Sequence, residues 1–183
     1  MSSPTIKTWT SENPPSIDIW MSIDILGVKS GESQELKTPI TSSTLFSHPK
    51  ALSESQTIYT LHSPSLLVSP SSPSSPSPTS LLGYAKTGLK DLWFYDPSNL
   101  KSSLKQYPST LALLDIYVDV QRKGYGKILM DHVYESNPNS VEGRKMVYDR
   151  PSRMLPGFLK KNYGLEGGEK QNNGFMLFKE FFD

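Results

Sequence analysis

The sequence predicts one α/β domain built on a mixed, mostly antiparallel sheet with two parallel strands at its centre. Residues 111–118 form an almost unbroken apolar run, as expected for a strand that is buried on both faces. A turn with two glycines and a helical pattern follow, and Lys145–Tyr148 form a second, shorter apolar run. Because a helix connects the two runs, we expect the two strands to lie parallel in one sheet.

Length and composition exclude several classes of protein. The 183 residues suit one packed domain, and 19 basic against 18 acidic residues argue against binding to nucleic acid or to membranes by bulk charge. The chain has no cysteine and three isolated histidines, so we expect no metal site. It starts without an apolar leader and contains no run of about 18 apolar residues, so the cytoplasm is the expected compartment.

The first third of the chain is expected to form an arm, a helix and a strand. Residues 1–15 are polar, end in two prolines and are expected to be a flexible arm before the domain of residues 16–183. Ser16 suits a helix N-cap, and Ile19–Leu26 carry apolar residues at helical spacing. Residues 57–61 are rich in β-branched and aromatic side chains, which favours a strand.

The middle of the chain contains a low-complexity segment. Every residue from 69 to 80 is Ser, Pro or Thr, and because such a segment has nothing to bury, we expect a disordered insertion. Residues 81–87 and 90–95 are strand-like, and we expect Gly88-Leu89 to join them as a hairpin. Residues 99–109 are polar and are interpreted as a loop.

The last third is expected to contain two helices and a final strand. After the 111–118 strand, a helix should cover residues 125–136. A second helix should follow Asp149, with Pro151 in its first turn and Gly164 as its C-terminal cap. Phe175–Phe182 are expected to supply the last strand.

The most informative segment is the turn Gln121–Gly126, between the central strand and the first of these helices. Gly124 and Gly126 allow a ligand to approach the backbone, and the free N–H groups of the helix start suit a pyrophosphate. Three side chains add positive charge there: Arg122, Lys123 and Lys127. On spacing alone, an ordinary strand-to-helix turn explains the pattern equally well.

The form Gln-x-x-Gly-x-Gly resembles the coenzyme A pyrophosphate loop of the GNAT acetyltransferase superfamily. From about Ile19 to Phe182 the chain is similar to the α-tubulin N-acetyltransferases of that superfamily. The segments that carry the similarity are Ser22–Gly27 with Gln34, Leu82–Lys86, Leu114–Val118, and Asp149–Ser152 with Tyr163 and Asn172-Asn173. Where that family has a cysteine just before the Leu-Asp-Ile-Tyr segment, this chain has Ala112.

The resemblance implies a GNAT fold, with the sheet splayed between the 111–118 and 144–149 strands, and acetyl-CoA as co-substrate. Two stretches would bind the coenzyme. The first comprises Ile116, Tyr117, Val118, Asp119, Val120, Gln121, Arg122, Lys123, Gly124, Tyr125, Gly126 and Lys127. The second comprises Ser152, Arg153, Met154, Leu155, Pro156, Gly157, Phe158, Leu159, Lys160 and Lys161.

Acetyl transfer to an amine needs an acceptor for the proton of the amine. The resemblance places a functional aspartate at Asp149, and the alternative is that Asp149 only caps a helix. Gln34 cannot take a proton at neutral pH, so we expect its amide to hold the substrate lysine or a water. An exposed helix glutamine is an equally good interpretation. Tyr163 lies where GNAT enzymes place a tyrosine near the thiolate leaving group, or else belongs to the core.

The implied function is transfer of acetyl from acetyl-CoA to a lysine in the lumenal loop of α-tubulin. The expected partners are α-tubulin and microtubules, with neither nucleic acid nor membrane, and the expected state is a monomer. The expected location is the cytoplasm and its microtubule cytoskeleton, including a cilium or flagellum. Two alternatives stay open. One is a GNAT acetyltransferase for another amine. The other is a catalytically weak microtubule-binding pseudoenzyme, as Ala112 and an N-terminal arm that is short for the family suggest.

Overall fold

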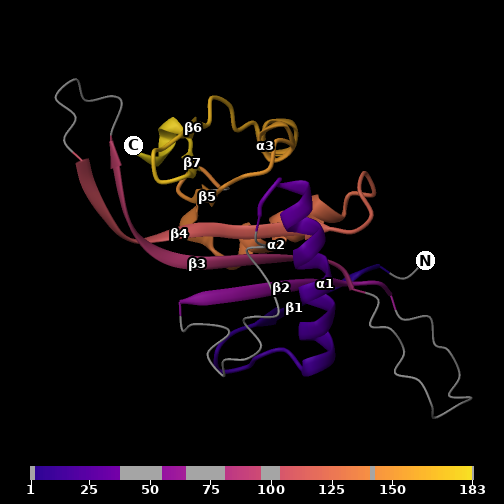
Figure 1. The fold of residues 1–183 in the computed structure, drawn as a ribbon. Coiled ribbons are helices and arrows are strands. Elements are labelled where there is room, and N and C mark those ends of the chain that lie inside the picture. Colours follow the sequence, from indigo (N-terminus) through magenta and orange to yellow (C-terminus); the bar gives the residue numbers. More distant parts are fainter. Residues whose placement is uncertain (1–2, 38–54, 65–80, 96–103, 141–142, 183) are drawn as a thin grey trace, which may run out of the picture.

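The computed structural model describes residues 3–37, 55–64, 81–95, 104–140 and 143–182. The insertion expected at residues 69–80 lies outside the described residues. Figure 1 shows the elements, which follow one another as β1 (Thr5–Trp9), α1 (Ile17–Ser33), β2 (Gln56–His62), β3 (Leu81–Tyr95), β4 (Leu104–Val118), α2 (Tyr125–Ser136), η2 (Pro138–Ser140), β5 (Val147–Asp149), α3 (Leu155–Tyr163), β6 (Glu169–Lys170), β7 (Phe175–Leu177) and η3 (Lys179–Phe181).

The described strands form one mixed sheet in the order β1-β2-β3-β4-β5-β7-β6. Within it β4 and β5 are parallel, and the other described neighbours are antiparallel. This confirms the predicted fold class and its parallel central pair. The ladder between β4 and β5 consists of Ala112 with Val147 and Leu113 with Tyr148. Because β4 then continues to Val118 after β5 has ended, the sheet opens between the two strands.

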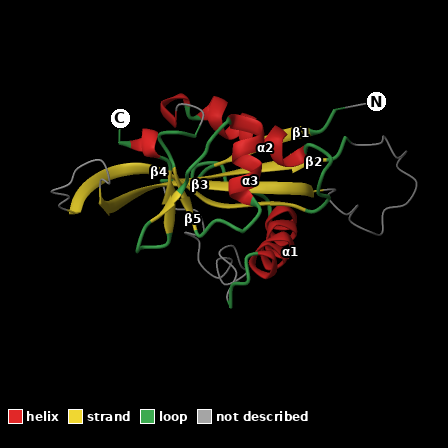
Figure 2. Ribbon diagram, turned by 90° about the horizontal axis from the view of Figure 1, so that it is seen from above, coloured by secondary structure: helices red, strands yellow, loops and turns green. Residues whose placement is uncertain are grey.

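Helix α1 covers one face of the sheet, as Figure 2 shows, and it confirms the helix predicted after Ser16. Its buried stripe of Ile19, Ile23 and Leu26 packs against Tyr84 and a neighbouring isoleucine of the sheet. The helix continues without a break through a buried glycine at position 27. Helical spacing of apolar residues therefore outweighed the low helix propensity of glycine.

Helices α2 and α3 cover the opposite face (Figure 2). Leu129 and Val133 of α2 and Leu159 of α3 are fully buried and share one core cluster with Leu113 of β4. Burial of such side chains stabilises the fold by roughly 1.5–3 kcal/mol each. This cluster fixes the start of α2, and with it the glycine turn, against the central strand.

The predicted hairpin at Gly88-Leu89 is wrong, because β3 is one strand of 15 residues. A Cβ atom at Gly88 would lie 3.0 Å from the side chain of Leu114 and 3.4 Å from the carbonyl oxygen of Ser55. The glycine therefore allows close packing inside the sheet and does not form a turn.

The loop predicted at residues 99–109 is also wrong in its second half, because β4 begins at Leu104. The register between β3 and β4 shifts beside Asp91, opposite Pro108 and Ser109. Ser109 has a φ of +50°, and its N–H donates to Asp91 Oδ1 at 2.8 Å. Such a bulge accepts proline within a strand, because the missing N–H is not needed in the ladder.

Three further expectations at the ends of elements are corrected. The expected arm of residues 1–15 contains the edge strand β1, whose Trp9 donates its indole N–H to Thr60 at 2.8 Å. Helix α3 begins at Leu155, so Pro151 precedes it. The last strand ends at Leu177, and a 3-10 turn follows. Gly164 is the C-cap of α3, with φ +68°, as predicted.

Candidate active site

A small cavity lies where β4 runs past the end of β5. Its lining includes Gln34 at the C-cap of α1, Asp149 at the end of β5, and Ile116, Ser152 and Leu155. Its volume is about 20 Å³, enough for one group of the size of a water molecule. The structure thus brings both predicted catalytic residues together with members of both predicted coenzyme stretches.

Asp149 is held in a partly buried position at this cavity. Its side chain is 19% exposed, and Arg150 Nε lies 3.7 Å from its carboxylate. Burial raises the pKa of Asp149 and the charge of Asp115 raises it further, while Arg150 and Lys90 lower it. Helix α3 begins at Leu155 and its N-cap position is Met154, so the alternative that Asp149 caps this helix is wrong. A carboxylate with a raised pKa suits a proton acceptor.

Gln34 is half-buried, so the alternative of an exposed helix glutamine is wrong. Its Nε2 lies 2.8 Å from Ser30 Oγ and 3.3 Å from Asp115 Oδ1. Glu35 follows with a φ of +58°, and its carboxylate lies 3.0 Å from the guanidinium of Arg153. Helix α1 therefore ends with its glutamine directed toward the sheet.

Asp115 is a residue of the cavity that the sequence reasoning did not single out. It is 4% exposed and accepts hydrogen bonds from Ser30 Oγ at 2.8 Å and from the hydroxyl of Tyr84. Lys86 lies directly opposite on β3 and is 5% exposed. Burial lowers the pKa of Lys86 while the charge of Asp115 raises it. The signal in the sequence was an aspartate inside an otherwise apolar run, since buried charges are kept only with partners.

The glycine turn fits the pyrophosphate of a coenzyme. Gly124 is the N-cap of α2, with φ +82°, and it supplies no side chain to cap the first backbone N–H groups of the helix. Arg122 and Lys123 are exposed beside them. A Cβ atom at Gly126 would lie 3.6 Å from the ring of Phe158, so the two predicted coenzyme stretches meet here.

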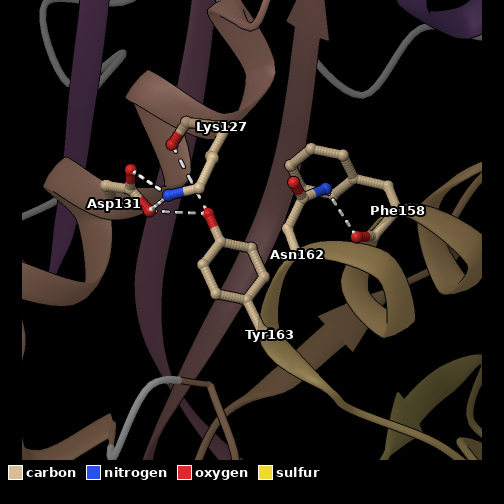
Figure 3. Close-up of polar contacts among 5 residues, drawn as sticks. All are labelled: Lys127, Asp131, Phe158, Asn162 and Tyr163. Carbon is tan, nitrogen blue, oxygen red and sulfur yellow. Dashed lines mark hydrogen bonds and ion pairs between the residues drawn. The ribbon is translucent and has the colours of Figure 1, made fainter.

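Lys127 and Tyr163 both contact Asp131 of α2 in the structure. Lys127 Nζ lies 2.6 Å from a carboxylate oxygen of Asp131, one turn further along α2, so its charge is already paired. Tyr163 donates its hydroxyl hydrogen to Asp131 Oδ1 at 2.9 Å. Figure 3 shows these side chains meeting between α2 and α3. Burial and this hydrogen bond raise the pKa of Tyr163, and the residue joins the two helices.

Several other candidate residues lie away from the cavity. Ala112 is fully buried among apolar side chains that include Phe94 and Leu177, and it does not line the cavity. Lys160 is exposed and lies 3.2 Å from the carboxylate of Glu166.

Among the described residues, no group of three or more His, Asp or Glu could hold a metal ion. No helix in the described part of the chain is long and apolar enough to span a membrane.

A mixed sheet that opens between parallel central strands, beside a glycine turn and a helix start, has the architecture of the GNAT acetyltransferases. The comparison with protein families agrees with this class. The model of the family described as GNAT acetyltransferase, Mec-17, matches residues 3–183, and the chain belongs to that family.

Similar proteins come from distant organisms. Over 55% of its own length, the chain is 39% identical to an α-tubulin N-acetyltransferase of Tetrahymena thermophila. Over 88% of its own length, it is 34% identical to α-tubulin N-acetyltransferase 1 of Drosophila melanogaster. It is 35% identical to an α-tubulin N-acetyltransferase of Leishmania infantum, also over 88%. These matches cover 24%, 32% and 57% of the relatives' own lengths, so the chain corresponds to only part of each.

Proposed function

We propose that this chain transfers acetyl from acetyl-CoA to the ε-amine of a lysine in the lumenal loop of α-tubulin. The observation that carries the proposal is the meeting of Gln34 and Asp149 in one small cavity, beside Ile116 and Ser152 of the two coenzyme stretches. The names of the relatives support the choice of substrate. On this proposal the protein works on microtubules, in the cytoplasm or in a cilium or flagellum.

The residues of the cavity suit the chemistry of acetyl transfer. Acetyl-CoA supplies the acetyl thioester, and the α2 start with Arg122 and Lys123 would hold its pyrophosphate. The neutral amine nitrogen forms a bond to the acetyl carbonyl carbon, the bond from that carbon to sulfur breaks, and coenzyme A leaves as its thiolate. Asp149 takes the proton that the nitrogen releases, and its raised pKa brings its basicity closer to neutral pH.

A groove beside this cavity supports a polypeptide substrate. It is open, has a volume of about 470 Å³, and is lined by Trp93 and Tyr95 of β3 and Leu104 of β4 together with Asn172 and Asn173. The side chains from β3 and β4 are 46–50% exposed. Aromatic side chains with amides suit an extended peptide, which needs both apolar contact and hydrogen bonds.

The backbone connects this groove to the catalytic aspartate. Arg150, which follows Asp149, donates its backbone N–H to the carbonyl oxygen of Gly174 at 3.1 Å, next to the asparagines of the groove. The amide of Asn173 donates to the carbonyl oxygen of Trp93 at 3.4 Å. A peptide in the groove would therefore lie close to the cavity that is to receive its lysine.

The test is to incubate the purified chain with acetyl-CoA and microtubules and to locate acetylated lysines by mass spectrometry. We expect one dominant modified lysine in α-tubulin, and a rate of modification lower by roughly 10²–10⁴ with the Asp149→Asn variant. Acetylation of free polyamines or of other proteins with unmodified tubulin would instead indicate another amine substrate. Microtubule binding without any acetyl transfer would indicate a non-catalytic protein.

A further inference from the structure

The side-chain amide of Gln34 has one chemically consistent orientation. Ser30 donates its single hydroxyl hydrogen to Asp115 Oδ1 at 2.8 Å, so toward Gln34 it can only accept. The carboxylate of Asp115 also only accepts. The Gln34 atom that lies 2.8 Å from Ser30 Oγ and 3.3 Å from Asp115 Oδ1 must therefore be its NH₂ group.

The carbonyl oxygen of Gln34 is consequently the group available to the cavity. Gln34 lines the cavity, and within the described part of the chain its Oε1 makes no hydrogen bond. Its two partners are rigidly placed, because Ser30 is 1% exposed and Asp115 is 4% exposed on the central strand. Tyr84 donates to the other carboxylate oxygen of Asp115, which fixes that carboxylate in turn.

An attacking lysine has geometric needs that match this arrangement. A neutral primary amine carries two N–H groups and one lone pair, and the lone pair must point at the acetyl carbonyl carbon. Two hydrogens are then left for two acceptors. Asp149 is one acceptor in the cavity, and Gln34 Oε1 is a second.

We propose that Ser30 and Asp115 are positioning residues that present the carbonyl oxygen of Gln34 to the attacking amine. Gln34 then accepts a hydrogen bond from the substrate nitrogen and donates none to the acetyl oxygen. The inference rests on the acetyl transfer proposed above. It also gives a reason for the substrate class, because a primary amine satisfies both acceptors while a hydroxyl group, with one hydrogen, satisfies only one.

Substitutions of Gln34 and Asp115 test the orientation of the Gln34 amide through the rate of acetyl transfer. Gln34→Glu alone places two carboxylates together and should lower kcat/KM for microtubules by about a hundredfold. Adding Asp115→Asn places an NH₂ donor beside the new carboxylate at position 34. That carboxylate still presents an acceptor oxygen to the cavity. The double variant should recover at least about tenfold over the single one, with acetyl-CoA affinity unchanged throughout. A double variant that folds and binds acetyl-CoA but shows no recovery would mean that Gln34 acts through its N–H groups.

A second measurement requires no turnover and therefore separates this inference from the proposed function. In ¹⁵N NMR spectra the side-chain NH₂ of Gln34, assigned by its loss in Gln34→Glu, should exchange slowly with solvent. Ser30→Ala should accelerate that exchange by about tenfold, the effect of one lost hydrogen bond. Exchange that is fast in the wild-type chain, or insensitive to Ser30→Ala, would overturn the orientation. Slow, Ser30-dependent exchange in a chain that does not acetylate microtubules would refute the proposed function and leave the orientation intact.

Discussion

The hydroxyl of Tyr163 donates a 2.9 Å hydrogen bond to Asp131, and the ring of Tyr163 packs edge-on against Tyr134 at 4.9 Å. Asp131 also pairs with Lys127, so three side chains form one contact between α2 and α3. The phenolic hydrogen is therefore directed at Asp131. A tyrosine held in this way stabilises the helix pair and is poorly placed to protonate a thiolate elsewhere.

Tyr163→Phe tests this structural role. The substitution keeps the ring packing and removes one hydrogen bond to a carboxylate, so it should lower the free energy of unfolding by about 1–2 kcal/mol. The rate of acetyl transfer at saturating substrates should stay nearly unchanged. Urea unfolding and single-turnover kinetics measure the two effects. A hundredfold slower chemical step in a stably folded variant would show that Tyr163 does protonate the leaving group.

The left-handed backbone at Gly124 leads to a prediction with a matched control. Gly124 and Gly167 have φ values of +82° and +69°, and a Cβ atom at either would meet no atom within 4 Å. Alanine at either position should therefore lower the free energy of unfolding by a similar amount, about 1 kcal/mol, because the left-handed backbone strains a residue with a Cβ atom. Because only Gly124 starts α2, only Gly124→Ala should also weaken acetyl-CoA binding in calorimetry. Equal acetyl-CoA affinities of the two variants would argue against a coenzyme site at this turn.

The sequence predicted the elements whose side chains have a regular period. Helices α1 and α2 and the parallel β4–β5 pair followed from apolar spacing and from the helix between the strands. The hairpin at Gly88 failed because a glycine inside a strand looks the same in sequence as a turn glycine. Pro108 and its polar neighbours hid the first part of β4, since a bulge depends on the partner strand and not on local propensity.

The candidate site was predicted in part. The resemblance placed Gln34 and Asp149, and both line the cavity. It did not single out Asp115 or Ser30, whose importance comes from contacts across 85 positions of the chain. Lys127 was predicted to add positive charge at the turn, and its pairing with Asp131 was not foreseen, because no local pattern shows whether a lysine four residues from an aspartate pairs with it or with a ligand.

The position of Ala112 predicts the result of restoring the family's cysteine. Ala112 is fully buried on β4, beside Gly88 of β3 and Val147 of β5, and it does not line the cavity. Ala112→Cys adds one sulfur atom to a packed cluster, which should lower stability by about 1 kcal/mol. Its acetylation rate should equal that of the wild-type chain. A rate increase of about tenfold would show that a thiol at this position reaches the reaction.

Asp149→Asn should have opposite effects on rate and on stability. The asparagine keeps the size of the side chain but cannot accept the proton, so the chemical rate should fall by roughly 10²–10⁴ with acetyl-CoA affinity unchanged. In the wild-type chain, kcat/KM should fall as the pH drops through the raised pKa of Asp149, at a higher pH than an ordinary carboxylate would give. Full single-turnover activity of the variant at neutral pH would place the base elsewhere.

The stability effect follows from the direction of the same pKa shift. Burial raises the pKa of Asp149, so the folded chain holds this proton more tightly than the unfolded chain. The contribution of Asp149 to stability therefore falls as the pH rises through the raised pKa, and the cost of the buried charge is fully present at neutral pH. Asp149→Asn should then melt at a higher temperature than the wild-type chain at pH 7. Below about pH 3, where the carboxyl is protonated in both states, the two melting temperatures should converge. A variant that is less stable at pH 7 would mean that the charge of Asp149 stabilises the fold, through Arg150, by more than its burial costs.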